Sequence, residues 1–159
     1  MVATKADPEH FPEVPNGVSV VIPTLDRADV LLDTVGDLTR QDFSEYELII
    51  VDQSEAPAEA VVGFLRTQAV TARYFKADFK GLPAARNFGW RHARYDVVLY
   101  VDDDIRTDES LVRAHYEAHV RTGAALVAGG VYDAKDGPDQ GGSGFVQLVD
   151  RARPGQLPG

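Results

Sequence analysis

Residues 97–104 read VVLYVDDD, an apolar run that ends abruptly in three carboxylates. A continuous run of branched and aromatic residues of this length is typical of a strand buried on both faces, as in a parallel sheet covered by helices. Ligands of open α/β sheets bind just beyond the carboxyl ends of the strands. The stretch therefore predicts a parallel α/β fold and a site at its acidic end.

The acidic triplet is a candidate cation site. Alternation along a strand would place Asp102 and Asp104 on one side and Asp103 on the other. Two carboxylates about 4 Å apart repel each other by roughly 4 kcal/mol at an effective dielectric near 20, and a divalent cation removes that repulsion. Oxygen ligands favour Mg²⁺ or Mn²⁺ over softer metals. The triplet alone leaves a second interpretation open, that of a solvated acidic turn.

Strand and helix patterns alternate along the rest of the chain. Further strands are predicted at residues 18–22, 47–52, 72–75 and 124–132. Helices are predicted after Asp26 or Asp29 as a cap, from Pro57, over residues 84–94, and from Thr107 to Gly123. This alternation indicates βαβ units, and hence a Rossmann-like, mostly parallel sheet flanked by helices.

Composition limits the class of protein. The chain has 159 residues, of which 44% are apolar, and this suits one globular domain. The net charge of −9 argues against a nucleic-acid or anionic-membrane partner. Cysteine is absent, so no disulfide or thiolate metal site is expected. No membrane span and no apolar region of a signal peptide is visible, which predicts a soluble, cytoplasmic protein.

Three regions follow from these patterns. Residues 1–17 carry prolines and mixed charge without periodicity, and a flexible lead-in is expected there. Residues 18–132 hold the predicted α/β domain. Residues 133–159 begin with a loop rich in Gly, Asp and Pro, followed by one more short element near residues 145–149.

Polar side chains follow three of the predicted strands. The first strand ends in Pro23-Thr24-Leu25-Asp26, the second in Asp52, and the fourth in the acidic triplet. Each could be a helix cap or a turn, but their coincidence along one edge favours a single crevice. Arg86 and Asn87 lie at the start of a predicted helix, a place that suits a phosphate.

Four segments together resemble the nucleotide-binding half of glycosyltransferase family 2, which has the A-type glycosyltransferase fold. These segments are VSVVIPTLDR from Val18, ELIIVDQS from Glu47, GLPAARNFGWRHA from Gly81, and the VVLYVDDD stretch. They occur in the order and spacing of that family and cover residues 18–132. The resemblance implies a nucleotide-sugar-binding domain followed, in residues 133–159, by the start of an incomplete acceptor-side region, so that the chain is apparently truncated.

The resemblance implies roles for individual residues. The pocket for the base and ribose would be lined by Pro23, Thr24, Leu25 and Asp26. Asp52 would bind the base, commonly uracil, and Arg86 with Asn87 would complete the base and phosphate side. Asp102-Asp103-Asp104 looks like the DxD motif of the family. Asp102 or Asp103 would face the ribose, and Asp104, together with Asp102, would hold Mn²⁺ or Mg²⁺ on the diphosphate.

The activity implied by the resemblance is a metal-dependent transfer of a sugar from a nucleotide-diphosphate donor, with a UDP-sugar favoured, to an unknown acceptor. The family mostly inverts the anomeric centre, which needs a general base. Asp133, Asp136 and Asp139 lie in a loop that does not look like the base motif of the family, so no base is assigned.

Two other functions remain to be compared with this activity. A donor-binding or regulatory module without turnover would fit a chain that lacks the acceptor half. A phosphoryl-transfer domain ranks lower, because such sites need a Lys at a later strand end and the fifth predicted strand has none. A dinucleotide-binding fold ranks lower still, because no G-x-G-x-x-G follows the first strand.

Overall fold

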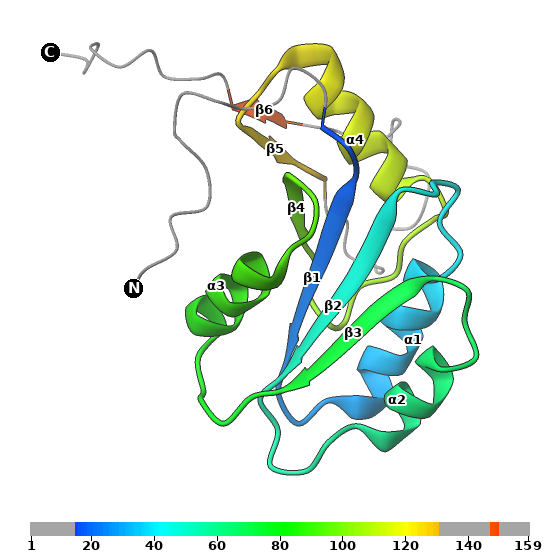
Figure 1. Ribbon diagram of the computed structural model, residues 1–159, viewed down its shortest axis with the longest axis vertical. Helices are drawn as coiled ribbons and strands as arrows, with labels where there is room; N and C mark the ends of the chain where they lie inside the picture. The colour runs from blue at the N-terminus through cyan, green and yellow to red at the C-terminus, as the bar shows by residue number, and fades with distance from the viewer. Residues whose placement is uncertain (1–14, 131–146, 150–159) are drawn as a thin grey trace, which may run out of the picture.

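A computed structural model describes residues 15–130 and 147–149 of the chain (Figure 1). Strands and helices alternate from the first strand to the fourth helix, as the sequence predicts. The elements are β1 (Val18–Thr24), α1 (Ala28–Leu38), β2 (Tyr46–Asp52), α2 (Glu59–Leu65), β3 (Thr71–Lys76), α3 (Leu82–His92), β4 (Val97–Tyr100), α4 (Leu111–Thr122), β5 (Leu126–Ala128) and β6 (Gln147–Val149).

The main sheet has four strands in the order β3-β2-β1-β4, and all of its pairs are parallel. The register sets Thr24 of β1 opposite Asp52 of β2. On the other side of β1, Val21 lies opposite Tyr100 of β4. β5 and β6 form a separate antiparallel pair. The expectation of a mostly parallel α/β sheet is confirmed.

Each face of the sheet has its own apolar core, because successive side chains of a strand point to opposite faces. Helices α1 and α2 cover one face, where Val20 and Ile22 of β1 lie in a cluster with Leu31 and Val35 of α1. Helix α3 covers the other face, where Val21 lies with Ala85. Figure 1 shows α1 and α2 on one side of the strands and α3 on the other. The two central strands, β1 and β2, are buried along their whole length.

The expectation that residues 97–101 form a strand buried on both faces is wrong. Within the described part of the chain, β4 lies at the edge of the main sheet, next to β1 alone. Its side chains alternate between buried and more exposed, and Tyr100 is 41% exposed. An apolar composition identifies a strand, but the neighbours that bury it are set by the topology of the sheet.

Several predicted boundaries shift by a few residues. Arg27, and not Asp26 or Asp29, is the residue that precedes α1, since Asp26 adopts a left-handed conformation with φ 55° before the helix begins. Helix α4 begins at Leu111 and not at Thr107. Its predicted end is confirmed, because Gly123 has φ 62°, a left-handed conformation that favours glycine.

Parts of the other predictions fall outside the described residues. Most of the lead-in over residues 1–17, the end of the predicted fifth strand and the loop after it cannot be compared with the structure. The short element expected near residues 145–149 includes β6. Among the described residues, none of the helices is both long enough and apolar enough to cross a lipid bilayer.

Candidate functional site

The carboxyl ends of β1, β2 and β4 lie side by side, because these three strands are neighbours and parallel. The Thr24 hydroxyl donates a hydrogen bond to Oδ2 of Asp103 at 2.7 Å, which joins the ends of β1 and β4. The Gln53 N–H donates to the carbonyl of Thr24 at 2.9 Å, which joins the ends of β1 and β2. The sequence-predicted polar strand ends therefore meet at one edge of the sheet.

Asp103 is the buried member of the acidic triplet, with 6% of its surface exposed. The side chains of Asp102 and Asp104 are 61% and 45% exposed, so the predicted alternation holds for exposure. The two exposed carboxylates do not share a partner, because the chain turns at residues 103–104, just after β4. Asp104 binds Arg27, and Asp102 binds Arg86.

Arg27 is the cation that neutralises two members of the triplet. Its guanidinium lies 3.0 Å from Oδ1 of Asp103 and 2.7 Å from Oδ2 of Asp104. The hydrogen bond that Arg27 donates to Asp104, together with the negative charge of Asp103, raises the pKa of Arg27. Sequence reasoning placed Arg27 in a turn and missed this role. A basic residue just after the first strand was the available signal.

Helix α3 brings Arg86 to the opposite side of the triplet. Its guanidinium lies 3.2 Å from Oδ1 of Asp102 and 5.8 Å from the centre of the Tyr100 ring, so it contacts both the strand end and its aromatic neighbour. Asn87, the next residue, is exposed. Both predicted residues of this helix are therefore on the surface, and Arg86 is at the acidic edge.

The close approach of α3 to the sheet depends on Gly89. A Cβ built at this position would lie 2.3 Å from Cγ1 of Val21 on β1. Any larger side chain would push the helix outward. Gly89 thus lets α3 lie against β1 and keeps Arg86 beside the carboxyl end of β4.

Asp52 is wholly buried at the end of β2. Its Oδ1 accepts the Ser54 N–H at 2.8 Å, and its Oδ2 accepts the Ala58 N–H at 3.3 Å and the hydroxyl of Tyr74. Burial alone would raise the pKa of Asp52, but these hydrogen bonds together hold it below its usual value. The two oxygens of Asp52 are therefore engaged by the loop after β2 and by Tyr74 of β3. Sequence reasoning gave no signal for Tyr74, which lies on β3.

The remaining predicted residues are partly buried in the sheet and partly exposed at its edge. Pro23 and Thr24 are buried in β1, whereas Leu25 and Asp26 are exposed beyond its end. The Asp26 N–H donates a hydrogen bond to the hydroxyl of Ser54 at 2.7 Å, which connects the turn after β1 to the loop after β2. The side chain of Leu25 is 38% exposed and offers an apolar surface at the same edge.

The carboxylates at this edge suit a hard divalent cation in their chemistry. Asp103 and Asp104 are both paired with Arg27, whose side chain is 46% exposed. Asp104 is accessible and offers oxygen ligands. Over residues 15–130 and 147–149, however, no group of three or more His, Cys, Asp or Glu side chains is arranged as a complete metal site. A cation here would need ligands from the bound substrate as well.

The comparisons with known proteins agree on one family. The sequence model of the family described as "Glycosyl transferase family 2" matches residues 19–151. Chondroitin synthase from Escherichia coli is 32% identical over 106 residues, which are 64% of this chain and 15% of that protein. The chain thus spans a small part of this relative.

Two solved structures share the fold. Mannosyltransferase PcManGT from Pyrobaculum calidifontis, in complex with GDP-Man and Mn²⁺, matches with a TM-score of 0.63 at 21% identity, over 77% of this chain and 37% of that one. TarS from S. aureus, in complex with UDP-GlcNAc, matches with a TM-score of 0.57 at 21% identity, over 68% of this chain and 32% of that one. The expected A-type glycosyltransferase fold is confirmed.

Proposed function

Because the chain belongs to glycosyltransferase family 2, we propose that the carboxyl-end site binds a nucleoside-diphosphate sugar with a divalent cation, for transfer of the sugar to an acceptor. The observation that carries this proposal is the meeting of Thr24, Asp52 and the acidic triplet at one edge of the sheet. The complexes of structural neighbours with UDP-GlcNAc and with GDP-Man and Mn²⁺ support it.

In this proposal, residues 18–132 form the donor-binding domain. Asp104, with Asp102, would hold Mn²⁺ or Mg²⁺ on the diphosphate, and Asp104 would give up its contact with Arg27 to do so. The cation would supply charge stabilisation for the leaving nucleoside diphosphate. Asp103 is held by Thr24 and Arg27, and it would orient the ribose from its buried position.

The other side of the donor would be bound by α3 and the loop after β2. The guanidinium of Arg86 and the exposed N-terminus of α3 offer positive charge to the phosphates. Pro23, Thr24, Leu25 and Asp26 would contact the base and ribose, with Asn87 opposite them. Asp52 would receive a base N–H only after its surroundings open, since its side chain is wholly buried.

The transfer is proposed to invert the anomeric centre, with a general base supplied from outside the described residues. The second candidate is a donor-binding module without turnover. The observation that favours it is that Asp102 and Asp104 are each paired with an arginine, and that no complete group of metal-ligating side chains is assembled over residues 15–130 and 147–149. Incubation with UDP-GlcNAc or GDP-Man distinguishes the two, since only a transferase releases nucleoside diphosphate in the presence of an acceptor or water.

Calorimetric titration of UDP, with GDP in parallel, tests the proposed site in the presence of Mn²⁺ and then of EDTA. We expect binding that depends on the cation and is lost in Asp104→Ala. Asp96→Ala is the matched control, because it removes an exposed carboxylate at the opposite end of β4. Binding of neither nucleotide, or equal binding by Asp104→Ala and Asp96→Ala, would overturn the proposal.

A further inference from the structure

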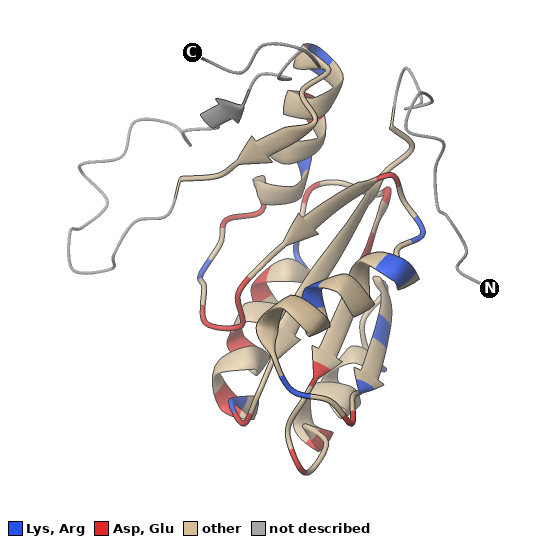
Figure 2. Cartoon of the chain, turned by 90° about the vertical axis from the view of Figure 1, so that its left-hand side faces the viewer, with Lys and Arg blue, Asp and Glu red and all other residues tan. Residues whose placement is uncertain are grey.

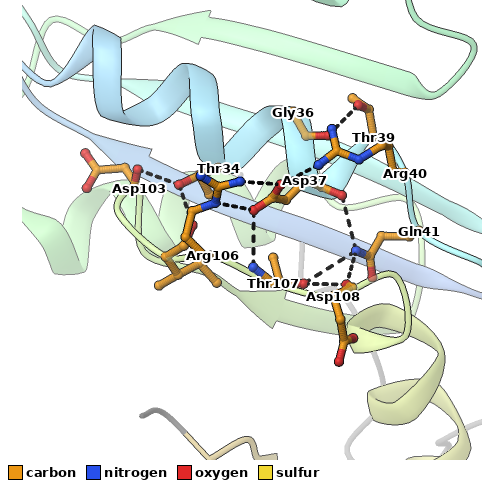
Figure 3. Close-up of polar contacts among 11 residues, drawn as sticks. Thr34, Gly36, Asp37, Thr39, Arg40, Gln41, Asp103, Arg106, Thr107 and Asp108 are labelled. Carbon is orange, nitrogen blue, oxygen red and sulfur yellow. Dashed lines mark hydrogen bonds and ion pairs between the residues drawn. The ribbon is translucent and has the colours of Figure 1, made fainter. Parts of the chain in front are cut away.

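One side of α1 runs along residues 103–109, which are part of the segment that joins β4 to α4 (Figure 3). This segment contains neither strand nor helix, and Figure 2 shows it carrying both acidic and basic residues. Thr34, Asp37 and Gln41 follow one another at spacings of three and four residues, so they line one side of the helix and its extension. Because the segment is neither strand nor helix, its backbone groups have no regular hydrogen-bond partners. The side chains of α1 and of Gln41 bind several of these groups instead.

Thr34 holds the main chain on both sides of Asp104. Its buried hydroxyl lies 2.8 Å from the carbonyl oxygen of Asp103 and 2.9 Å from that of Ile105. Gln41 holds the far end of the segment in the same way. Its side-chain amide donates to the carbonyl of Asp108 at 2.7 Å and accepts the N–H of Val112 at 2.9 Å.

Asp37 binds the middle of the segment with a buried carboxylate, of which 4% is exposed. Its Oδ2 accepts Nε of Arg106 at 2.6 Å and the N–H of Thr107 at 3.3 Å. Its Oδ1 accepts Nη2 of Arg106 at 3.1 Å and Nη2 of Arg40 at 2.5 Å. The hydrogen bond from Arg106 holds the pKa of Asp37 below its usual value in spite of burial.

The pairing of Asp37 with Arg106 is bidentate, and such pairs fix orientation as well as distance. Arg106 follows Asp104 by two residues, so the path of the chain at Asp104 is bounded by Thr34 before it and by Asp37 after it. The Asp37 carboxylate is the charged contact of α1 on this part of the segment.

We infer that Asp37 is a positioning residue for the donor site, which acts through Arg106 and the Thr107 N–H to aim Asp104 at the cation and diphosphate. The inference rests on the proposed function, because it assigns Asp37 to the support of the same site. Loss of a group that orients a metal ligand typically lowers metal affinity by roughly 10–100-fold. Asp37 binds Arg106 and the Thr107 N–H, and so supports the backbone just after Asp104.

Asp37→Asn is the variant that isolates this role. The amide has the shape of the carboxylate but presents one acceptor oxygen and an NH₂ group to the four donors around it. The bidentate pairing is therefore lost without creation of a cavity. Arg106 has a side chain that is 71% exposed, so it is not left as a buried charge.

Asp42→Asn is the matched control. Asp42 is an exposed carboxylate shortly after α1, and it binds Arg113 of α4 at 2.8 to 3.1 Å. The replacement therefore removes an ion pair between the loop after α1 and helix α4, at a distance from Arg106 and Thr107. Circular dichroism melting curves of both variants report whether the fold is intact.

The experiment is calorimetric titration of UDP, with GDP in parallel, into the wild-type chain and both variants, in Mn²⁺ and in EDTA. In Asp37→Asn we expect the affinity in Mn²⁺ to fall by roughly tenfold or more, the lower range for partners of metal ligands. Its affinity in EDTA should stay unchanged, and Asp42→Asn should match the wild type in both conditions. A purely structural role would lower both affinities of Asp37→Asn together.

The outcomes separate the two proposals. Wild-type protein that binds neither nucleotide overturns the proposed function. Wild-type protein that binds with Mn²⁺, while Asp37→Asn binds equally well or loses both affinities in parallel, overturns the positioning role alone. If Asp37→Asn does not fold, Arg106→Gln takes its place and is expected to show the same selective loss, because it breaks the pairing from the exposed side. Unchanged binding by Arg106→Gln then overturns the inference.

Discussion

Replacement of Gly89 by Ala tests how the structure places α3 against the sheet. A Cβ at Gly89 would lie 2.3 Å from Cγ1 of Val21 and 3.0 Å from its Cγ2, both on a buried side chain of the central strand β1. Because carbon atoms in contact are about 3.5–4 Å apart, either the helix or the strand has to move. Gly63 offers the matched control, since a Cβ added there in α2 meets nothing within 4 Å.

The expected magnitude follows from these contacts. Extra methyl groups in a well-filled core lower the free energy of unfolding by about 1–3 kcal/mol. Alanine in place of glycine within a helix raises it by about 1 kcal/mol. The 2.3 Å approach favours the upper end of the first range, so Gly89→Ala should lose about 2 kcal/mol net. Gly63→Ala should gain about 1 kcal/mol, because only the helix term applies.

Urea unfolding followed by far-UV circular dichroism measures both changes. With a slope near 2 kcal/mol per molar urea, the unfolding midpoint of Gly89→Ala should fall by about 1 M. Gly63→Ala should shift it in the opposite direction. Wild-type stability of Gly89→Ala, or a gain like that of Gly63→Ala, would refute the close approach of α3 to Val21 and, with it, the placement of Arg86 beside Asp102.

Two further outcomes concern buried polar contacts. Tyr74→Phe removes the hydroxyl that binds the buried Asp52 carboxylate, and should lower the free energy of unfolding by about 1–3 kcal/mol in the same urea assay; an unchanged midpoint would contradict the contact. Asp37 has a lowered pKa, so its ionised form stabilises the fold above about pH 4 and this contribution disappears as acid protonates it. The stability difference between the wild type and Asp37→Asn should therefore be complete at pH 6 and shrink below about pH 4, whereas a constant difference across this range would show that charge is not the cause.

The alternation of strands and helices could be predicted from the sequence because periodicity is a local property. Apolar runs such as residues 18–22 and 47–52 predict strands whatever their position in the sheet. In the same way, the helical spacing of Leu31 and Val35 can be recognised from a short stretch of sequence. The burial of residues 97–101 could not be predicted in the same way. Whether a strand has one neighbour or two depends on pairing with segments far away in the chain, and the composition of β4 resembles that of β1.

The site residues likewise differ in whether a local sequence pattern or a distant contact identifies them. Strand ends reveal Thr24, Asp52 and the acidic triplet, because a polar residue directly after an apolar run stands out locally. Their proposed roles in donor binding stay predictions, and the structure adds that the strand ends that carry them lie side by side and that Thr24 binds Asp103. Tyr74 carries no such local mark, since the carboxylate that it binds lies 22 residues away in sequence. Arg27 is marked only as a basic residue after the first strand, and its partner Asp103 lies 76 residues away.

Asp37 shows most clearly why residues that support the site cannot be predicted from the sequence. In a helical pattern it is an acidic residue between Val35 and Leu38, and solvent exposure is the ordinary expectation for such a position. Asp37 is buried because residues 103–108 lie against α1. From this segment, the guanidinium of Arg106 and the backbone N–H of Thr107 both donate hydrogen bonds to the Asp37 carboxylate. A buried carboxylate is stable only when such partners surround it, so its presence in the core indicates that the path of this segment matters. The proposed positioning role would give the pairing of Asp37 with Arg106 a function beyond the connection of β4 with α4.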